Sequence, residues 1–291
     1  MKPASFDYAR AESVAHAVRL LSEAGGDSKI IAGGQSLMPM MNFRLVKPSL
    51  LVDINAIAGL DGIDRMGDRL RIGALVRHRM TAENDEIEAT IPILHAAMKH
   101  VAHLTVRNRG TFCGSVCHAD PAAEMPMMTL LLNGTVNASS VRGERAIAAQ
   151  EFFTGSLVTA LEPDEFVTSI DIDTLPDGVG WGFEEFSRRH GDYALAAVAV
   201  TMMVRDGVAR DVRIGIMGVG ETPTRLPSLE DMVEGNVVTV ALKDELIRSL
   251  GETITPNSDL NGSADYRRHL AGALFGRAVT DAWARANRSQ P

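Results

Sequence analysis

The spacing of apolar residues near the N-terminus predicts one amphipathic helix. Within SVAHAVRLLSE, apolar side chains recur at the i, i+3, i+4, i+7 spacing of a single buried helix face: Val14, Ala17, Val18 and Leu21. Ser13 is of a residue type that caps helix N-termini, and Gly25 is of the type that ends helices. We therefore predict a helix that begins after Ser13 and ends before Gly25.

Short apolar runs bounded by turn residues predict strands in the rest of the first half. These runs cover residues 29–32, 50–54 and 70–75, and a turn followed by a longer strand covers residues 161–173. Residues 120–133 have the pattern of a helix, with Pro121 in its first turn and Asn133–Gly134 at its exit. The chain up to about residue 175 is thus predicted to mix helices and strands.

The pattern changes after residue 175. Leu-Pro-Asp-Gly at 175–178 is typical of a linker. YALAAVAVTMMVR and VARDVRIGIMGVG then predict two strands joined by a hairpin turn at Asp206–Gly207. Two helices are predicted to close the chain, and one face of the second is formed by Tyr266, Leu270, Ala273 and Leu274. We expect antiparallel hairpins packed against helices in this part.

Composition narrows the class of protein. The chain has 291 residues, which is enough for two domains, with 45% apolar and 23% charged residues. A net charge of −8 argues against nucleic-acid binding, and two cysteines exclude a disulfide scaffold. The segment MKPASFDYAR carries no apolar signal region, and no apolar run approaches the roughly 20 residues that span a bilayer. We expect a soluble, cytoplasmic protein with no membrane span.

Two glycine-containing segments are candidates for ligand binding. Ala32–Ser36 lies between a predicted strand and a short helix, with Ser36 as a possible N-cap, and fits neither the Rossmann nor the P-loop spacing. Arg109–Ser115 follows about 80 residues later. One such segment is usually a simple turn, but two could clamp both ends of a pyrophosphate. Asp120 could accept a hydrogen bond from a ribose or ribityl hydroxyl, or could cap a helix ahead of Pro121.

Other reactive residue types have simpler interpretations. Cys113 and Cys117 could form half of a metal site, but a second pair of ligands is missing, and an iron–sulfur cluster normally needs four cysteines. We interpret them as small buried thiols. His100 and His103 could share one side of a helix, and we interpret them as histidines at a helix edge. The methionines beside both glycine segments are interpreted as core residues.

Four segments together resemble a known family. AGGQSLMPMMNFRL, RNRGTFCGSVCHADPAAEMP, TALEPDEFVTSI and FSRRHGDYALAAVAV, in this order, resemble the FAD-binding medium subunit of the molybdenum hydroxylases. These are the flavoproteins of the carbon monoxide dehydrogenase and xanthine dehydrogenase family. The resemblance extends from about residue 3 to residue 285, which is nearly the whole chain.

The resemblance implies an α+β fold in two domains. Residues 1–175 would form an FAD-binding domain of the vanillyl-alcohol-oxidase (PCMH) type, with lobes over about 1–57 and 58–175. Residues 176–291 would form a C-terminal α+β domain with a three-stranded antiparallel sheet, as in carbon monoxide dehydrogenase flavoproteins.

The resemblance also implies which residues bind FAD. Ala32–Ser36 and Thr111–Ser115 would hold the pyrophosphate, Leu161 would lie near the isoalloxazine, and Tyr193 would approach it from the C-terminal domain. The implied cofactor-binding residues are Lys29, Ile31, Ala32, Gly33, Gly34, Gln35, Ser36, Leu37, Thr111, Cys113, Gly114, Ser115, Asp120, Leu161 and Tyr193. Since redox chemistry belongs to the cofactor, we expect no catalytic side chain in this chain. Because a second pair of ligands is missing beside Cys113 and Cys117, we expect no metal site either.

The implied function is electron transfer within a larger oxidoreductase. A large partner subunit would carry the molybdopterin cofactor and hydroxylate the substrate, and a small partner would carry [2Fe–2S] clusters that reduce the flavin. The complex would be a dimer of heterotrimers. Substrates such as carbon monoxide, a purine, an N-heteroaromatic compound or an aldehyde stay open, as do quinone, NAD⁺, O₂ or a protein as electron acceptor.

Cys113 departs from the family pattern, and two alternatives stay open. The family usually reads T-[IL]-G-G-S where this chain reads Thr-Phe-Cys-Gly-Ser, and a Cβ at this position is disfavoured if its φ is positive. We expect Cys113 to be a tolerated substitution for glycine in a loop that faces the cofactor. The alternatives are a self-sufficient two-domain flavin oxidase or dehydrogenase, and a scaffold that has lost its flavin.

Overall fold

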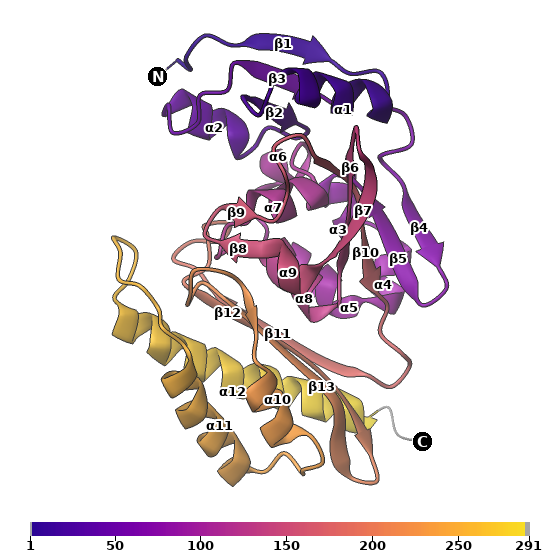
Figure 1. Ribbon diagram of the computed structural model, residues 1–291. Coiled ribbons are helices and arrows are strands. Elements are labelled where there is room, and N and C mark those ends of the chain that lie inside the picture. The colour runs from indigo at the N-terminus through magenta and orange to yellow at the C-terminus, as the bar shows by residue number, and fades with distance from the viewer. Residues whose placement is uncertain (1, 289–291) are drawn as a thin grey trace.

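The fold consists of three stacked layers, each built on its own sheet (Figure 1). The structure is a computed structural model, and it describes residues 2–288. We call the layers the N-terminal, middle and C-terminal layers, in chain order. The fold class is α+β, as predicted, because every layer combines a sheet with helices.

The N-terminal layer is a small parallel sheet in the order β1-β3-β2, covered by α1. Its elements are β1 (Asp7–Arg10), α1 (Val14–Glu23), β2 (Ser28–Ile31), α2 (Leu37–Asn42) and β3 (Leu50–Asp53). The prediction for α1 is confirmed: Ser13 caps it by accepting a hydrogen bond from the backbone N–H of His16 at 3.1 Å. The predicted apolar stripe buries Ala17, Val18 and Leu21.

The middle layer is an antiparallel sheet in the order β4-β5-β10-β6-β7. Its strands are β4 (Ile63–Met66), β5 (Arg69–Gly73), β6 (Thr135–Ser140), β7 (Gly143–Ala148) and β10 (Phe166–Asp173). Its helices are α3 (His78–Ala82), α4 (Asp85–Thr90), α5 (Pro92–Met98), α6 (Leu104–Arg107), α7 (Phe112–His118), α8 (Glu124–Leu131) and α9 (Ala149–Phe152). A small hairpin, β8 (Phe153–Gly155) and β9 (Val158–Thr159), completes the layer.

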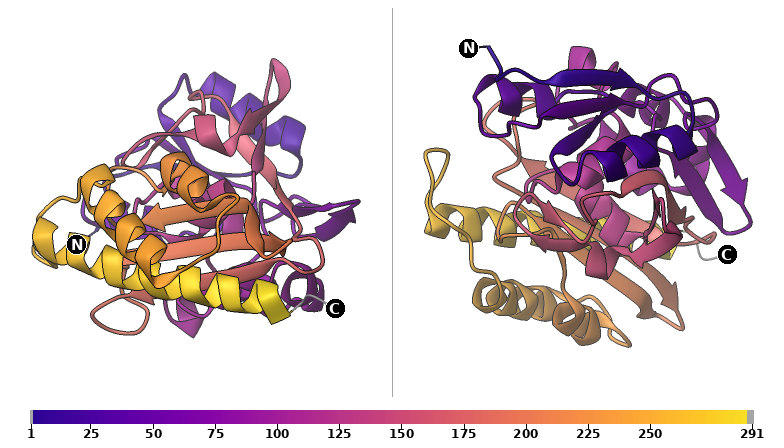
Figure 2. Two further views of the ribbon diagram at one scale, coloured as in Figure 1. Left: turned by 90° about the horizontal axis from the view of Figure 1, so that it is seen from below. Right: turned by 45° about the horizontal axis from the view of Figure 1, so that its top comes forward.

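The C-terminal layer is an antiparallel sheet in the order β11-β12-β13-β14, with α12 along one face (Figure 2). Its elements are β11 (Gly180–Phe186), β12 (Ala196–Arg205), β13 (Val208–Met217), β14 (Thr224–Arg225), α10 (Pro227–Val233), α11 (Val240–Thr253) and α12 (Ala264–Arg288). The predicted hairpin turn at Asp206–Gly207 joins β12 to β13. The three expected strands are present, and the two-residue β14 extends the sheet beyond them.

The two faces of β11 contact different parts of the chain, α12 on one side and the middle layer on the other. A Cβ on Gly182 would lie 2.0 Å from the carbonyl oxygen of Ala278, so α12 packs directly on the strand backbone at this face. Because side chains alternate along a strand, Trp181 and Phe183 point the other way, and both pack against the core of the middle layer. The C-terminal sheet is therefore buried between α12 and the middle layer.

Two helix predictions need correction. The helix predicted from residue 120 begins at Glu124, because Pro121 lies in a preceding turn. Three helices rather than two follow the C-terminal sheet, and the predicted face of α12 is wrong, since Tyr266 and Ala273 are exposed. Its buried face is built largely from small residues because α12 approaches the backbone of β11 closely: Ala271, Gly272, Leu274, Phe275, Ala278 and Ala282.

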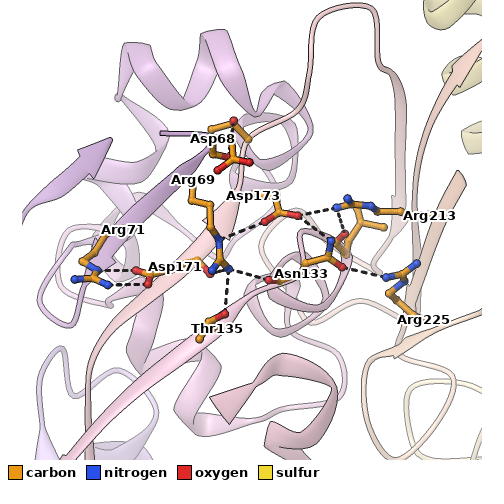
Figure 3. Close-up of polar contacts among 11 residues, drawn as sticks. Asp68, Arg69, Arg71, Asn133, Thr135, Asp171, Asp173, Arg213 and Arg225 are labelled. Carbon is orange, nitrogen blue, oxygen red and sulfur yellow. Dashed lines mark hydrogen bonds and ion pairs between the residues drawn. The ribbon is translucent and has the colours of Figure 1, made fainter. Parts of the chain in front are cut away.

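A polar network joins the middle and C-terminal layers (Figure 3). Asp173, at the end of β10, accepts from Asn133 at 2.8 Å and lies 3.3 Å from both Arg69 and Arg213. Arg225 on β14 donates to the side-chain oxygen of Asn133 at 3.2 Å. Because Arg213 and Arg225 belong to the C-terminal layer, these bonds fix its position on the middle layer.

Candidate functional site

The first glycine segment offers a row of backbone donors. Residues 32–36 connect β2 to α2, and Gly34 has a φ of +70°, which suits glycine. Within residues 2–288, no group accepts a backbone hydrogen bond from the N–H groups of residues 33–37. Ser36 precedes α2 but makes no side-chain cap, contrary to its predicted role. Consecutive N–H groups of this kind suit an anion.

The second glycine segment is the start of a helix rather than a loop. Thr111 caps α7, and its hydroxyl accepts a hydrogen bond from the N–H of Gly114 at 3.0 Å. Cys113 therefore has helical backbone geometry, and its φ is not positive, so its Cβ causes no strain. Its thiol points into the core, 3.5 Å from the carbonyl oxygen of Ile72. Cys113 was expected in a loop that faces the cofactor. The structure corrects this, because Cys113 lies in α7 and its side chain faces the core.

The two segments lie in direct contact. A Cβ built on Gly33 would lie 2.3 Å from the carbonyl oxygen of Arg109 and 2.7 Å from the Cα of Gly110. Real Cβ atoms do not approach backbone atoms this closely, so glycine is needed at position 33 for the segments to meet. The structure therefore brings the two predicted binding segments together, although they belong to different layers.

Asn55 and Arg77 bridge the two segments. The side-chain amide of Asn55 donates to the carbonyl oxygen of Ala32 at 2.9 Å, and its oxygen accepts from Arg77 at 2.6 Å. Arg77 also donates to the carbonyl oxygen of Arg109. Burial and the nearby charge of Arg109 lower the pKa of the Arg77 guanidinium, which still stays cationic. Sequence reasoning missed both residues, because neither belongs to a glycine motif.

Asp120 and Tyr193 come from different layers and face the same site. Asp120 follows α7 and accepts from the N–H of Ala122 at 2.9 Å, so it closes a turn and does not cap a helix. Desolvation and the carboxylates of Asp120 and Glu124 raise the pKa of the Tyr193 phenol to about 12, while a hydrogen bond with Ser36 lowers it. Tyr193 of the C-terminal layer thus approaches Ser36 of the N-terminal layer and Asp120 of the middle layer.

The remaining predicted site residues lie around this centre. Leu161 follows the β8–β9 hairpin and packs against the core of the middle layer. The hairpin is attached to the end of α7, since the N–H of Leu157 donates to the carbonyl oxygen of Ala119 at 3.1 Å. Lys29 is exposed on β2, while Ile31, Gln35, Leu37 and Ser115 are half-buried.

Cys113 is a buried thiol, as predicted, whereas Cys117 is only partly buried and packs against the core of the middle layer. Burial raises the pKa of Cys117 to about 12 and moves the pKa of Cys113 in the same direction. His100 and His103 do not share a helix, because α5 ends at Met98 and α6 begins after His103. Among residues 2–288, no group of three or more His, Cys, Asp and Glu side chains has the arrangement of a metal site. Nor does any helix in this range have the length and apolar character needed to cross a membrane.

Comparison with protein families places this fold and site in a known class. Residues 4–174 match the FAD binding domain in molybdopterin dehydrogenase, and residues 181–282 match the CO dehydrogenase flavoprotein C-terminal domain. The chain belongs to this family of FAD-binding oxidoreductase subunits, which confirms the resemblance described above.

Individual relatives match over nearly their whole length. The chain is 40% identical to the nicotine 6-hydroxylase medium subunit of Paenarthrobacter nicotinovorans, over 98% of this chain and 100% of the relative. It is 36% identical to the carbon monoxide dehydrogenase medium chain of Afipia carboxidovorans, over 98% and 99% of the two chains. A solved carbon monoxide dehydrogenase from Hydrogenophaga pseudoflava superimposes with a TM-score of 0.95 at 35% identity, over 98% of this chain and 99% of that chain.

Proposed function

We propose that this chain is the electron-transfer subunit of a heterotrimeric molybdenum hydroxylase. It accepts electrons from a small [2Fe–2S] subunit and passes them to an external acceptor, while a large molybdopterin subunit hydroxylates the substrate. Relatives of nearly the same length are named as medium subunits or medium chains, which supports a role as one component of such a complex. We further propose a cytoplasmic dimer of heterotrimers.

The observation that carries the proposal is the paired donor set of the two glycine segments. The N–H groups of residues 33–37 suit one group of anionic oxygens, and the N-terminus of α7, which Thr111 caps, lies beside them. Arg77 adds a positive charge close to both. These groups fit the pyrophosphate of FAD, whose two phosphates need donors on both sides. Cys113 contributes backbone only, because its thiol is buried.

Asp120, Leu161 and Tyr193 are proposed to contact the rest of the cofactor. Asp120 presents a carboxylate at the end of α7, where it can accept hydrogen bonds from cofactor hydroxyls. Tyr193 approaches from the C-terminal layer and would lie against the flavin ring, with Leu161 nearby. When bound, the flavin accepts electrons singly and delivers them in pairs. The chain's own residues hold it, orient it and set its electrostatic surroundings.

The layers support the proposed division of the chain. The FAD-binding domain would comprise residues 1–175, with its two lobes at 1–57 and 58–175 corresponding to the N-terminal and middle layers. The C-terminal domain would comprise residues 176–291, and the C-terminal layer lies within it. The relatives are named for nicotine, caffeine, glyceraldehyde and carbon monoxide, so subunits of this one type serve very different substrates. We infer that the large partner subunit selects the substrate.

Two measurements test this function. The purified chain should bind FAD in preference to FMN, because FMN lacks the pyrophosphate that both segments would hold. Co-expression with the large and small partner subunits should then yield a complex whose flavin is reduced when substrate is added, with the isolated chain inert toward that substrate. Full substrate turnover by the isolated chain would instead establish the self-sufficient oxidase, and absence of any flavin binding would establish the flavin-free scaffold.

A further inference from the structure

Arg267 is a buried guanidinium in the first turn of α12. It is 7% exposed, and within residues 2–288 it is the only arginine or lysine that is buried. Burying a cation is costly unless its donors find acceptors, and the planar fork of arginine holds several acceptors in a fixed relation. The acceptors of Arg267 therefore indicate which parts of the chain it holds together.

Arg267 binds three separate segments of the chain. Its Nη1 donates to the carbonyl oxygens of Leu195 at 2.8 Å and of Gly218 at 2.9 Å. Its Nη2 donates to the carboxylate of Asp259 at 2.9 Å, in the connection between α11 and α12. Leu195 directly precedes β12 and Gly218 directly follows β13, so one guanidinium group fixes the ends of two neighbouring strands.

The bond to Leu195 fixes the base of the loop that carries Tyr193. The N–H of Leu195 donates to the carbonyl oxygen of Phe186 at 2.8 Å, which closes the loop between β11 and β12. A Cβ on Gly191 would lie 2.7 Å from the ring of His103, so this loop also lies directly on the middle layer. Tyr193 is placed between these two contacts along the chain. Its approach to the proposed flavin site therefore depends on where Leu195 is held.

The bond to Gly218 fixes the turn that carries Asp120. The N–H of Gly218 donates to the carbonyl oxygen of Pro121 at 2.8 Å, and Pro121 directly follows Asp120. Gly218 has a φ of +77°, and a Cβ there would lie 2.9 Å from the carbonyl oxygen of Leu195. Glycine is therefore needed for this strand end to reach Pro121 while its own carbonyl lies beside that of Leu195 at Arg267.

We propose that Arg267 is a positioning residue of the flavin site, which holds Tyr193 and Asp120 in a fixed relation so that both contact the same bound FAD. The inference rests on the function proposed above, and it assigns Arg267 no contact with the cofactor itself. Arg77 has a different role, since it joins the two glycine segments and shares no hydrogen-bond partner with Arg267. Arg77 thus holds the segments for the pyrophosphate, and Arg267 holds residues that contact the rest of the cofactor.

The first experiment tests the positions of the two segments without flavin. Arg267→Lys retains the charge but replaces the planar fork by a single ammonium group, which cannot keep all three bonds in the same geometry. In the flavin-free full-length chain, amide hydrogen exchange should become faster than in the parent over residues 187–195 and 218–222. Arg268→Lys is the matched control, because this neighbouring side chain donates instead to Gly251 of α11. Parent-like exchange over both segments in Arg267→Lys would overturn the proposal.

The second experiment asks whether flavin binding depends on these positions. Arg267→Lys should raise the Kd for FAD about tenfold, which is the worth of one hydrogen bond from a charged donor. It should also change the visible circular dichroism of the flavin that remains bound, because the residues around the ring have moved. Arg268→Lys should change neither quantity. A purely structural role of Arg267 would lower stability in urea and leave both quantities at the parent value, and that result would overturn the proposal.

Double variants separate the two sets of bonds. When Arg267→Lys is combined with Tyr193→Ala, the increase in Kd should be smaller than the product of the single increases, because Arg267 acts partly through Tyr193. When Arg267→Lys is combined with Arg77→Met, the increases should multiply. Multiplying increases in both combinations would overturn the proposal. A parent chain that binds no FAD would overturn the proposed function and this role with it, and this failure is distinct because the parent shows it before any variant is compared.

Discussion

Replacing Arg77 with methionine should weaken flavin binding without unfolding the chain. Arg77 joins the two glycine segments by donating to Asn55 at 2.6 Å and to the carbonyl oxygen of Arg109. Methionine retains a long apolar side chain but makes neither bond. The N–H groups of residues 33–37 and the start of α7 would then lose the bridge that holds them in a fixed relation.

The magnitude follows from the bonds that are lost. A hydrogen bond from a charged donor contributes about 1.5–3 kcal/mol. Arg77 is half-buried, and water can replace part of what is lost, so we expect a net effect of about 2 kcal/mol on the bound state. This corresponds to a roughly 30-fold increase in the Kd for FAD. Equilibrium titration, with flavin fluorescence as the signal, measures it directly.

The matched control is Arg79→Met. Arg79 lies two residues away and forms an exposed i,i+4 ion pair with Glu83, which is worth at most about 1 kcal/mol and does not touch the site. Asn55→Ala breaks the same bridge from its other end, so the double variant Asn55→Ala/Arg77→Met should lose less affinity than the sum of the single variants. Unchanged affinity in Arg77→Met, or strictly additive losses in the double variant, would refute the bridge.

Three further changes have defined outcomes. Glu185→Gln should become more stable relative to the parent as pH rises, by about 2.7 kcal/mol between about pH 6 and pH 8 in chemical unfolding. Burial raises the pKa of Glu185 from 4.5 to about 9, so over this range the folded parent holds a proton that the unfolded chain releases, and the parent loses stability as pH rises; a difference independent of pH would contradict this. Gly182→Ala should cost about 3 kcal/mol in urea unfolding, because its Cβ would meet the backbone of α12, whereas Gly251→Ala, with only an ordinary contact 3.8 Å away, should cost nothing. Cys113→Ala should retain its FAD content, and the parent thiol should resist alkylation because burial raises its pKa; rapid alkylation together with flavin loss would assign this thiol a role at the site.

Local sequence signals predicted the elements that depend on neighbouring residues. The helix after Ser13 and the hairpin at Asp206–Gly207 are confirmed, because caps and turns are set within a few residues. The two glycine segments were identified as candidate binding segments from their own residues, and the family resemblance assigned them to the pyrophosphate of FAD. The structure brings them into contact through Gly33.

The remaining features depend on contacts distant in sequence. Asn55 and Arg77 meet only because β3 lies beside β2 and because Arg77 pairs with Thr111 in an isolated β-bridge. The Cys113 thiol points into the core because of where Cys113 lies around the axis of α7. The glycine-type motif predicted a loop at this position, and a loop would not fix that direction. The burial of the Glu185 side chain cannot be read from FEEF, because it depends on which face of β11 meets the middle layer.

The position of β10 has a consequence for how the chain is made. β10 is the central strand of the middle sheet, pairing Asp171 with Arg71 on one side and with Thr135 on the other, yet it is the last of the five strands to be synthesised. Until residue 173 has left the ribosome, β5 and β6 each expose an unpaired edge. During synthesis, the β4–β5 and β6–β7 strand pairs must therefore avoid pairing with other strands until β10 has been made. A chain truncated before residue 166 lacks β10, so neither the N-terminal layer nor the C-terminal layer has a complete middle layer to pack against.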